Sequence, residues 1–334
     1  MLTCTLRRCG CLAALAAIVL AGCGGSQARS AAPGSPEKAH IAVGIAVPGA
    51  TYLPVYLAVD DGLFAGQGLQ VDLLEFRGGS DVIKALVAGS LDIGVVGLAE
   101  VTAGIDAGQP LKAFYGGFNV PDFDWYAAAS VKSLADAKGK RIGVTQYGTT
   151  TDFLTRYVLA VNGIDPVRDA QVVQAGPGAT RLAAMQAGQL DVAIFSSPDK
   201  FMAAELGYKK IYIQKQLARD YPTHVFVATE SFLAANPATL RAVLRAHVDT
   251  VRRAKQDRKQ AEAVLTKRLQ LDAKYVAMAY DDVIPYIFED GRLPQDLELF
   301  FDIGIKNGRY KERWPTAKFW TSMYVDTYPQ WKPA

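Results

Sequence analysis

The sequence predicts an α/β protein of two lobes, each built on a mixed β-sheet flanked by helices. From His40 onward, strand-like apolar runs alternate with helix-like segments of about a dozen residues, a pattern typical of mixed sheets covered on both faces. The chain has 334 residues, 50% of them hydrophobic, which is enough for two domains with substantial cores. A motif also occurs twice, as AGSLDIGVVG at 88–97 and AGQLDVAIFS at 187–196, which indicates two similar lobes that each form one wall of a cleft.

The first series of elements begins at residue 40. A β-branched run there is stopped by Pro48 and Gly49, and Thr51 is expected to cap the helix that follows. Pro54 is compatible with the first turn of that helix, where its missing N–H costs nothing. The expected strands are 40–47, 69–76, 91–97 and 111–117, and the expected helical segments are 51–64 and 78–90.

The second series begins near residue 140 and has the same rhythm. Threonines open its first helix and are expected to cap it, and Gly163 is expected to end it. In the repeated motif, Gly89 and Gly188 are expected to stop a helix, because glycine enters the left-handed region without a Cβ penalty. The expected strands are 141–145, 171–174 and 190–196, and the expected helices are 148–163 and 179–189.

After Tyr221 the chain is expected to form one strand, 223–230, and then mostly helices. The helix over 237–254 has an apolar stripe that includes His247, which we expect to be a satisfied histidine at the edge of the core rather than a ligand. The charged run at 252–260 is expected to be a solvated helix surface, with docking to a partner as the alternative.

The N-terminus is typical of an export signal. Arg7 and Arg8 precede an apolar run over 11–21, which is about half of the ~20 residues that a membrane-spanning helix needs. The sequence Leu-Ala-Gly-Cys at 20–23 resembles the bacterial lipoprotein processing box. That resemblance implies removal of residues 1–22 and acylation of Cys23, whereas the alternative is an ordinary signal peptide with an incidental cysteine.

Cysteine usage and charge narrow the class of protein further. The four cysteines lie at positions 4, 9, 11 and 23, so the predicted folded part contains no thiol and no disulfide. The segment 23–38 is rich in Gly, Ser, Ala and Pro, and we expect a flexible tether between lipid anchor and domain. The balance of 36 basic and 33 acidic residues offers no basic patch for nucleic acid. The protein is therefore expected in the periplasm or cell envelope, anchored to a membrane by lipid.

No catalytic or metal-binding motif stands out. Three histidines, His40, His224 and His247, are too few and too scattered for a metal site, and no Gly-x-Ser-x-Gly or phosphate-loop motif occurs. The stretch GPGATR at 176–181 lacks the third glycine of a dinucleotide-binding loop. We therefore expect no enzymatic activity, no metal and no cofactor.

The segments GIAVPGATYLPVYLAVDDGLFAGQGLQVDLLEF (44–76) and GGSDVIKALVAGSLDIGVVG (78–97) resemble substrate-binding proteins of bacterial ABC importers. The similar branch handles nitrate, sulfonates, taurine and pyrimidine precursors, and the resemblance extends over about 40–260. It implies a type II periplasmic-binding-protein fold with two hinge crossings. It also implies capture of a small organic ligand (an organic acid, a sulfonate or a heteroaromatic compound) and delivery to a permease. Eukaryotic pyrimidine synthases that share this fold carry a Cys-rich motif, which this chain lacks.

This architecture implies how the chain divides. Lobe 1 is expected to comprise 39–125 and 222–334, and lobe 2 to comprise 128–219, with the ligand between them at the carboxyl ends of the strands. A monomer is expected. The alternatives are an exported enzyme on the same scaffold, acting on a pyrimidine-like or small organic substrate, and a sensory domain.

The candidate ligand contacts lie in loops that follow strands, several of which open helices whose free N–H groups attract anions. Glu100 is expected either to complement its own helix dipole or to accept from an amine or ring N–H. Phe123 or Trp125, in an aromatic-rich stretch, would suit a planar organic ligand. The predicted contacts are Tyr52, Gly79, Ser80, Leu98, Ala99, Glu100, Asn119, Phe123, Trp125, Tyr147, Gly148, Thr149, Thr150, Gly178, Ser196 and Ser197.

Overall fold

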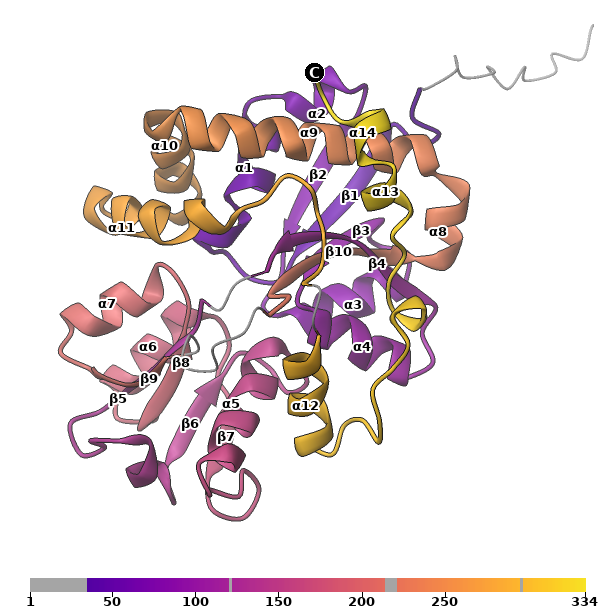
Figure 1. The fold of residues 1–334 in the computed structure, drawn as a ribbon. Coiled ribbons are helices and arrows are strands. Elements are labelled where there is room, and N and C mark those ends of the chain that lie inside the picture. Colours follow the sequence, from indigo (N-terminus) through magenta and orange to yellow (C-terminus); the bar gives the residue numbers. More distant parts are fainter. Residues whose placement is uncertain (1–34, 120–121, 214–220, 295–296) are drawn as a thin grey trace, which may run out of the picture.

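Two five-stranded β-sheets, each flanked by helices, form the frame of the molecule (Figure 1). The computed structural model describes residues 35–119, 122–213, 221–294 and 297–334. The predicted signal peptide, the predicted lipid site at Cys23 and most of the predicted tether lie outside these residues. Across the described ranges, none of the helices is both long and apolar enough to span a bilayer.

The first sheet has the strand order β2-β1-β3-β10-β4. Strand β1 pairs in parallel with β2 and β3, whereas β10 runs antiparallel to β3 and β4. Strands β1 and β3 are almost fully buried, which explains their continuous apolar runs. The strands are β1 (His40–Ile45), β2 (Gln70–Glu75), β3 (Ile93–Val96), β4 (Leu111–Phe118) and β10 (His224–Thr229).

The second sheet follows the same plan, with the order β7-β6-β8-β5-β9. Strand β6 pairs in parallel with β7 and β8, and β5 runs antiparallel to β8 and β9. Its strands are β5 (Asp124–Ala127), β6 (Arg141–Val144), β7 (Gln171–Gln174), β8 (Val192–Phe195) and β9 (Lys209–Ile213). Strands β5 and β9 were not among the expected elements, because short segments flanked by charged residues carry little periodicity.

The antiparallel strand in each sheet is the first that the chain forms after crossing from the other lobe. The chain leaves the first sheet after Phe118 and enters the second at Asp124, then leaves after Ile213 and returns at His224. These two passages occupy the place of the two predicted hinge crossings. The exact lobe boundaries at residues 125, 128, 219 and 222 stay predictions.

The helices cover both sheets and also link the lobes. Helix α1 packs on α9 and α10, whereas α12 lies against α5 and α11 lies against α7, so the C-terminal part of the chain touches the second lobe (Figure 1). The α-helices are α1 (Leu53–Asp60), α2 (Leu63–Gly66), α3 (Gly79–Val87), α4 (Leu98–Asp106), α5 (Thr150–Val161), α6 (Gly178–Gln186), α7 (Asp199–Glu205), α8 (Glu230–Ala235), α9 (Pro237–Gln256), α10 (Arg258–Leu269), α11 (Ala273–Val283), α12 (Glu298–Lys306), α13 (Met323–Asp326) and α14 (Tyr328–Trp331), and the 3₁₀ turns are η1 (Ala50–Tyr52), η2 (Leu134–Ala137), η4 (Ile284–Tyr286) and η5 (Thr316–Lys318).

The repeated Leu-Asp motif makes the same contacts in both lobes. Asp92 Oδ2 accepts a hydrogen bond of 2.9 Å from the backbone N–H of Ala42 in β1, and Asp191 Oδ2 accepts one of 2.9 Å from the N–H of Arg141 in β6. The preceding leucines, Leu91 and Leu190, are buried in both lobes. The aspartate therefore ties the turn to the neighbouring parallel strand, which explains why the motif occurs twice.

Several local expectations were wrong. The helix expected over 51–64 is broken at Gly62, whose φ of 68° lies in the left-handed region and starts α2 on a new axis. Thr51 does not cap α1, because the N-cap of that helix is Tyr52, which makes no side-chain cap hydrogen bond. The charged run at 252–260 is mostly exposed, as expected, but it belongs to two helices, because α9 ends at Gln256 and Asp257 caps α10 through the N–H of Gln260.

His247 is buried as expected, but it is not a satisfied edge residue. Its ring lies among Tyr115 and Phe226, with ring centroids 5.8 and 4.9 Å away. Within the described part of the chain its Nε2 has no hydrogen-bond partner. Burial lowers its pKa to about 4, so this imidazole is a neutral core group.

Candidate functional site

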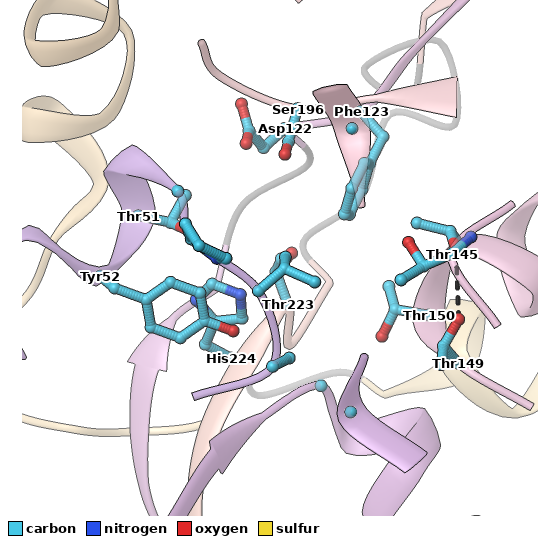
Figure 2. A pocket seen from close by; sticks show the side chains of 18 of the residues that line it. Thr51, Tyr52, Asp122, Phe123, Thr145, Thr149, Thr150, Ser196, Thr223 and His224 are labelled. Carbon is cyan, nitrogen blue, oxygen red and sulfur yellow. Dashed lines mark hydrogen bonds between the residues drawn. The ribbon is translucent and has the colours of Figure 1, made fainter. Parts of the chain in front are cut away.

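A cavity lies between the two sheets and is lined by both lobes (Figure 2). The space inside it for the centres of water-sized molecules is about 60 Å³. A single water needs roughly 10–15 Å³ of such space, so the cavity has room for a compact ligand of a few heavy atoms. Its lining consists of Ala46, Val47, Pro48, Gly49, Thr51, Tyr52, Gly79, Gly97, Glu100, Asp122, Phe123, Thr145, Thr149, Thr150, Thr151, Gly178, Arg181, Ser196, Asp199, Thr223 and His224.

Several helices begin at this lining. Gly79, Thr150 and Gly178 are the first residues of α3, α5 and α6, and Gly97 is the N-cap of α4. The N–H groups of a first helical turn have no partner within the helix, and the helix dipole adds positive potential there. The cavity is thus surrounded by main-chain donors from both lobes.

Glu100 crosses from the first lobe to one of these helix ends. Its Oε1 accepts from the N–H of Thr150 at 3.0 Å, and its Oε2 accepts from Thr150 Oγ1 at 2.8 Å. The residue is 5% exposed. Burial raises its pKa, whereas the Thr150 hydrogen bonds and the charge of Arg309 lower it. Glu100 lies in the first turn of α4, where it can complement its own helix dipole as expected, and it also completes the N-terminus of α5 in the other lobe.

Glycines make this contact possible. A Cβ on Gly97 would lie 2.5 Å from Glu100 Oε2 and would overlap Thr150 Oγ1. A Cβ on Gly79 would lie 2.7 Å from Glu100 Cγ. Neither glycine has a positive φ, so the requirement is close approach between the lobes rather than an unusual backbone conformation.

A second charged group in the cavity is the pair of Arg181 and Asp199. Arg181 is 3% exposed and donates to neutral oxygens: Nη1 to Thr145 Oγ1 at 2.7 Å, and Nε to the carbonyl of Ile194 at 3.1 Å. Burial lowers the pKa of Arg181 to about 10, and Asp199 opposes that change. Burial likewise raises the pKa of Asp199 to about 6 against the attraction of Arg181.

An aromatic wall closes one side of the cavity. Tyr52 stacks on His224 with ring centroids 4.3 Å apart and an interplanar angle of 19°. In Figure 2, Phe123 reaches into the space between this pair and the threonines of the second lobe. Burial lowers the pKa of His224 to about 3, so its ring is neutral at physiological pH and adds no positive charge.

Beside the cavity, a buried ionic cluster joins three parts of the chain. Lys200 Nζ, from α7, lies 2.9 Å from Asp122 Oδ1 and 2.5 Å from Asp282 Oδ2 of α11. Ser197 Oγ also donates to Asp282. Burial raises the pKa of Asp122 to about 7, while Lys200 lowers it. The cluster connects the second lobe to a helix of the first, next to the first hinge passage.

Half of the predicted contact residues line the cavity, and half do not. Those in the lining are Tyr52, Gly79, Glu100, Phe123, Thr149, Thr150, Gly178 and Ser196. Those outside it are Ser80, Leu98, Ala99, Asn119, Trp125, Tyr147, Gly148 and Ser197. Contact of any of them with a ligand stays a prediction.

The residues outside the lining have other partners. Trp125 is buried and donates from Nε1 to Thr155 Oγ1 at 3.0 Å. Tyr147 is 54% exposed, and its carbonyl accepts from Ser80 Oγ at 3.3 Å across the lobes. The N–H of Gly148 donates to Asp152 Oδ2 at 3.0 Å. Asn119 donates to the carbonyl of Arg292, and Leu98 and Ala99 are buried in the core.

Other lining residues were missed. Thr145 follows β6 directly and could have been found from the rule that ligands bind beyond the carboxyl ends of strands. Thr223 precedes β10 and His224 is its first residue, at the second crossing, and only the topology brings them to the cavity. Thr149 was expected to cap its helix, but it is the N-cap without a side-chain cap bond, and its Oγ1 donates to the carbonyl of Gln146 at 2.7 Å.

The described residues contain no group of three or more His, Cys, Asp or Glu side chains that could hold a metal ion. The described lining of the cavity offers hydrogen-bond donors, acceptors and aromatic faces.

Comparison with known proteins places this geometry in context. The model of the NMT1-like family matches residues 34–269. A nitrate/nitrite binding protein NrtA of Nostoc sp. is 27% identical over 175 residues, 50% of this chain and 39% of that protein. A 4-amino-5-hydroxymethyl-2-methylpyrimidine phosphate synthase of Uromyces fabae is 32% identical over 111 residues, 32% of this chain and 33% of that enzyme. The chain thus matches less than half the length of these relatives.

Among solved structures, the alkanesulfonate-binding protein SsuA of Xanthomonas axonopodis pv. citri, bound to MOPS, superimposes with a TM-score of 0.72. The superposition covers 86% of this chain and 99% of that one at 21% identity. This likeness concerns the fold, and it confirms the predicted two-lobe architecture with a mixed sheet in each lobe.

Proposed function

The chain belongs to the NMT1-like family, and from this premise we propose that it is an extracytoplasmic solute-binding lipoprotein of an ABC importer. It captures a small organic molecule between its two lobes and delivers the molecule to a membrane permease. The observation that carries this proposal is the cavity, whose walls come from both sheets and whose polar groups converge on a space of ligand size.

Contacts between the lobes support a protein that closes on its ligand. Glu100 meets Thr150 within the cavity, Lys200 meets Asp282 beside it, and Lys274 Nζ of α11 lies 2.5 Å from Glu205 Oε1 of α7 at the surface. Further contacts join the lobes away from these three, among them Ser80 with Tyr147 and α12 with α5. A hinged protein with such contacts alternates between an open form that admits solute and a closed form that the permease recognises.

The ligand class follows from the lining. The aromatic wall and the threonine hydroxyls suit an organic acid, a sulfonate or a heteroaromatic compound, held by a few placed polar groups. The names of two similar proteins refer to nitrate and alkanesulfonate. Small anions therefore stay within the set to be tested.

An exported enzyme on this scaffold is the second candidate, because one relative is named as a pyrimidine phosphate synthase. The cavity argues for it less well. The acidic groups of the lining are engaged by Thr150, Lys200 and Arg181, and no cysteine occurs after position 23. Turnover of a bound pyrimidine by the purified protein would establish the enzyme and displace the first proposal.

The anchor and the lobes belong to the same proposal. We place the lipid on Cys23, the lobe boundaries at 39–125 with 222–334 and at 128–219, and the protein in the periplasm or cell envelope as a monomer. Replacing Cys23 with Ser should release the protein from the membrane fraction of the host. Retention of the variant in that fraction would exclude the thiol as the attachment point.

The test of the function is ligand-dependent stabilisation of the purified chain. A ligand that binds only the folded state at a hundredfold excess over its Kd adds about 2.7 kcal/mol to the free energy of unfolding. For a chain of this size that shifts the Tm by roughly 4–5 °C. A screen of organic acids, sulfonates and heteroaromatic compounds should contain at least one such ligand. If no compound shifts the Tm at 10 mM, the proposed function is wrong.

A further inference from the structure

The cavity carries more acidic than basic groups. Among the described residues, its lining includes Glu100, Asp122 and Asp199 but only one cation, Arg181. Asp122 is neutralised by Lys200 at 2.9 Å, and Asp199 and Arg181 offset each other's charge. Arg309 is the cation that acts on Glu100, and its effect is smaller than that of burial and of the Thr150 hydrogen bonds. Glu100 is therefore the least compensated charge that faces the cavity.

The helix ends that would attract an anion already hold carboxylates of the chain itself. Glu100 occupies the N-terminus of α5, where it accepts from both the N–H and the hydroxyl of Thr150. Asp199 lies directly against Gly178, the first residue of α6, because a Cβ on Gly178 would overlap the carboxylate of Asp199. An incoming anion would meet two internal anions at the positions where the positive potential is strongest.

Glu100 keeps acceptor capacity for a ligand. A carboxylate has about four lone-pair sites. Thr150 uses one on each oxygen, and the backbone N–H of Glu100 itself also donates to the carboxylate. The residue lines the cavity, so the remaining sites are open to a donor that enters it. Arg181 directs three of its five N–H donors at protein oxygens, those of Thr145, Ile194 and Gly176.

The neighbouring wall favours a flat ligand. The stacked rings of Tyr52 and His224 lie across the cavity from the threonines of the second lobe, and the ring of Phe123 projects into the space between them (Figure 2). Aromatic faces carry negative potential and attract planar cations and polarised rings. This wall and the carboxylate of Glu100 therefore select the same kind of molecule.

We infer that the cavity takes a small planar ligand that donates N–H groups to Glu100, such as an amidinium, a guanidinium or an amino-substituted heteroaromatic ring, and that it rejects nitrate and simple sulfonates. This inference rests on the proposed function, because it specifies the ligand chemistry of the same cavity. It separates this chain from the relatives whose names refer to nitrate and alkanesulfonate.

The first experiment measures binding of two probe sets to the wild-type protein by isothermal titration calorimetry. The donor probes are acetamidinium, 2-aminoimidazole and 4-aminopyrimidine, and the anion probes are nitrate and methanesulfonate. We expect at least one donor probe to bind with a Kd tenfold or more below that of either anion. Equal or tighter binding of an anion overturns the inference and leaves the proposed function standing.

The second experiment uses Glu100→Gln, which keeps the shape but replaces one acceptor oxygen with a donor. A hydrogen bond to a charged group contributes roughly a factor of ten or more to a binding constant. Loss of the charged acceptor should therefore raise the Kd of the best donor probe at least tenfold. Glu312→Gln, a change of the same type at an exposed position, should leave the Kd unchanged. If E100Q, folded as judged by its circular dichroism, binds the donor probe as tightly as the wild type, Glu100 does not select the ligand.

A third variant, Glu100→Ala, tests the exclusion of anions. It removes the internal carboxylate and leaves the N–H and hydroxyl of Thr150 facing a cavity enlarged by the lost side chain. We expect nitrate or methanesulfonate to bind this variant at least tenfold more tightly than the wild type. No gain in anion binding overturns the view that Glu100 excludes anions. If the wild type binds neither probe set but a compound of the wider screen raises its Tm, the inference fails and the function stands.

Discussion

Replacing His247 with Phe should make the protein more resistant to acid. His247 is 4% exposed in α9 and packs against Tyr115 and Phe226. Its Nε2 has no hydrogen-bond partner among the described residues, and burial lowers its pKa to about 4. A histidine in the unfolded chain binds its proton near pH 6.5. The stability that neutral His247 contributes is therefore complete above pH 6.5 and is lost as the pH falls towards 4.

The size of the effect follows from this difference in pKa. As the pH falls from 6.5 to 4, each pH unit lowers the free energy of unfolding by about 1.4 kcal/mol, because only the unfolded state takes up the proton. At pH 5 the wild type should have lost about 2 kcal/mol through this one residue. Any packing cost of the larger phenylalanine ring applies at both pH values and cancels in the comparison.

The assay is urea unfolding at pH 7.5 and pH 5.0, followed by circular dichroism. The wild type should lose about 2 kcal/mol more than H247F between the two pH values. His40→Phe is the control, since the side chain of His40 is 57% exposed in its pair with Asp72, and this variant should keep the acid loss of the wild type. Equal acid losses in H247F and the wild type would refute the reasoning, because they would mean that buried His247 takes up its proton without penalty.

Three further predictions concern closure and stability. Lys200→Met leaves Asp122 buried without its cation and should lower the free energy of unfolding by about 3 kcal/mol at pH 8, measured by urea unfolding. Adding Asp122→Asn should restore part of this stability. A single variant as stable as the wild type would contradict this view. Gly97→Ala is compatible with its backbone φ of −68° but would overlap Thr150 across the lobes, so closure should weaken by about 1–3 kcal/mol. Small-angle scattering should then give a larger radius of gyration than for the wild type, and an unchanged radius would speak against it. Gln270→Gly relieves the one non-glycine residue with positive φ (53°) in the described chain and should stabilise it by about 0.5–1 kcal/mol in urea unfolding.

The positions of most elements could be predicted from the chain because their causes are local. Alternating apolar periodicity placed β7 at its observed residues, Gln171–Gln174, and located β10 within a residue at each end. Strands β5 and β9 escaped prediction because β5 pairs with β8 and β9, which lie far along the chain, and because charged flanks hide the periodicity of both strands.

The candidate site was predicted only in part, for a related reason. The rule that ligands bind beyond strand ends found Tyr52, Gly79 and Thr150. It also selected Trp125, whose side chain turns into the core and donates to Thr155. The side of the strand that a residue faces depends on register, which a loop position does not reveal.

By itself the sequence determined two repeats of one strand-helix-strand plan, each closed by a Leu-Asp turn, because hydrophobic periodicity and glycine stops act over a few residues. Only the tertiary structure decided which residues line the cavity. The contact of Glu100 with Thr150 joins residues 50 positions apart on different lobes. Such a contact depends on how two separately folded sheets approach each other, and the free energy of that approach is set by packing and charge over the whole interface.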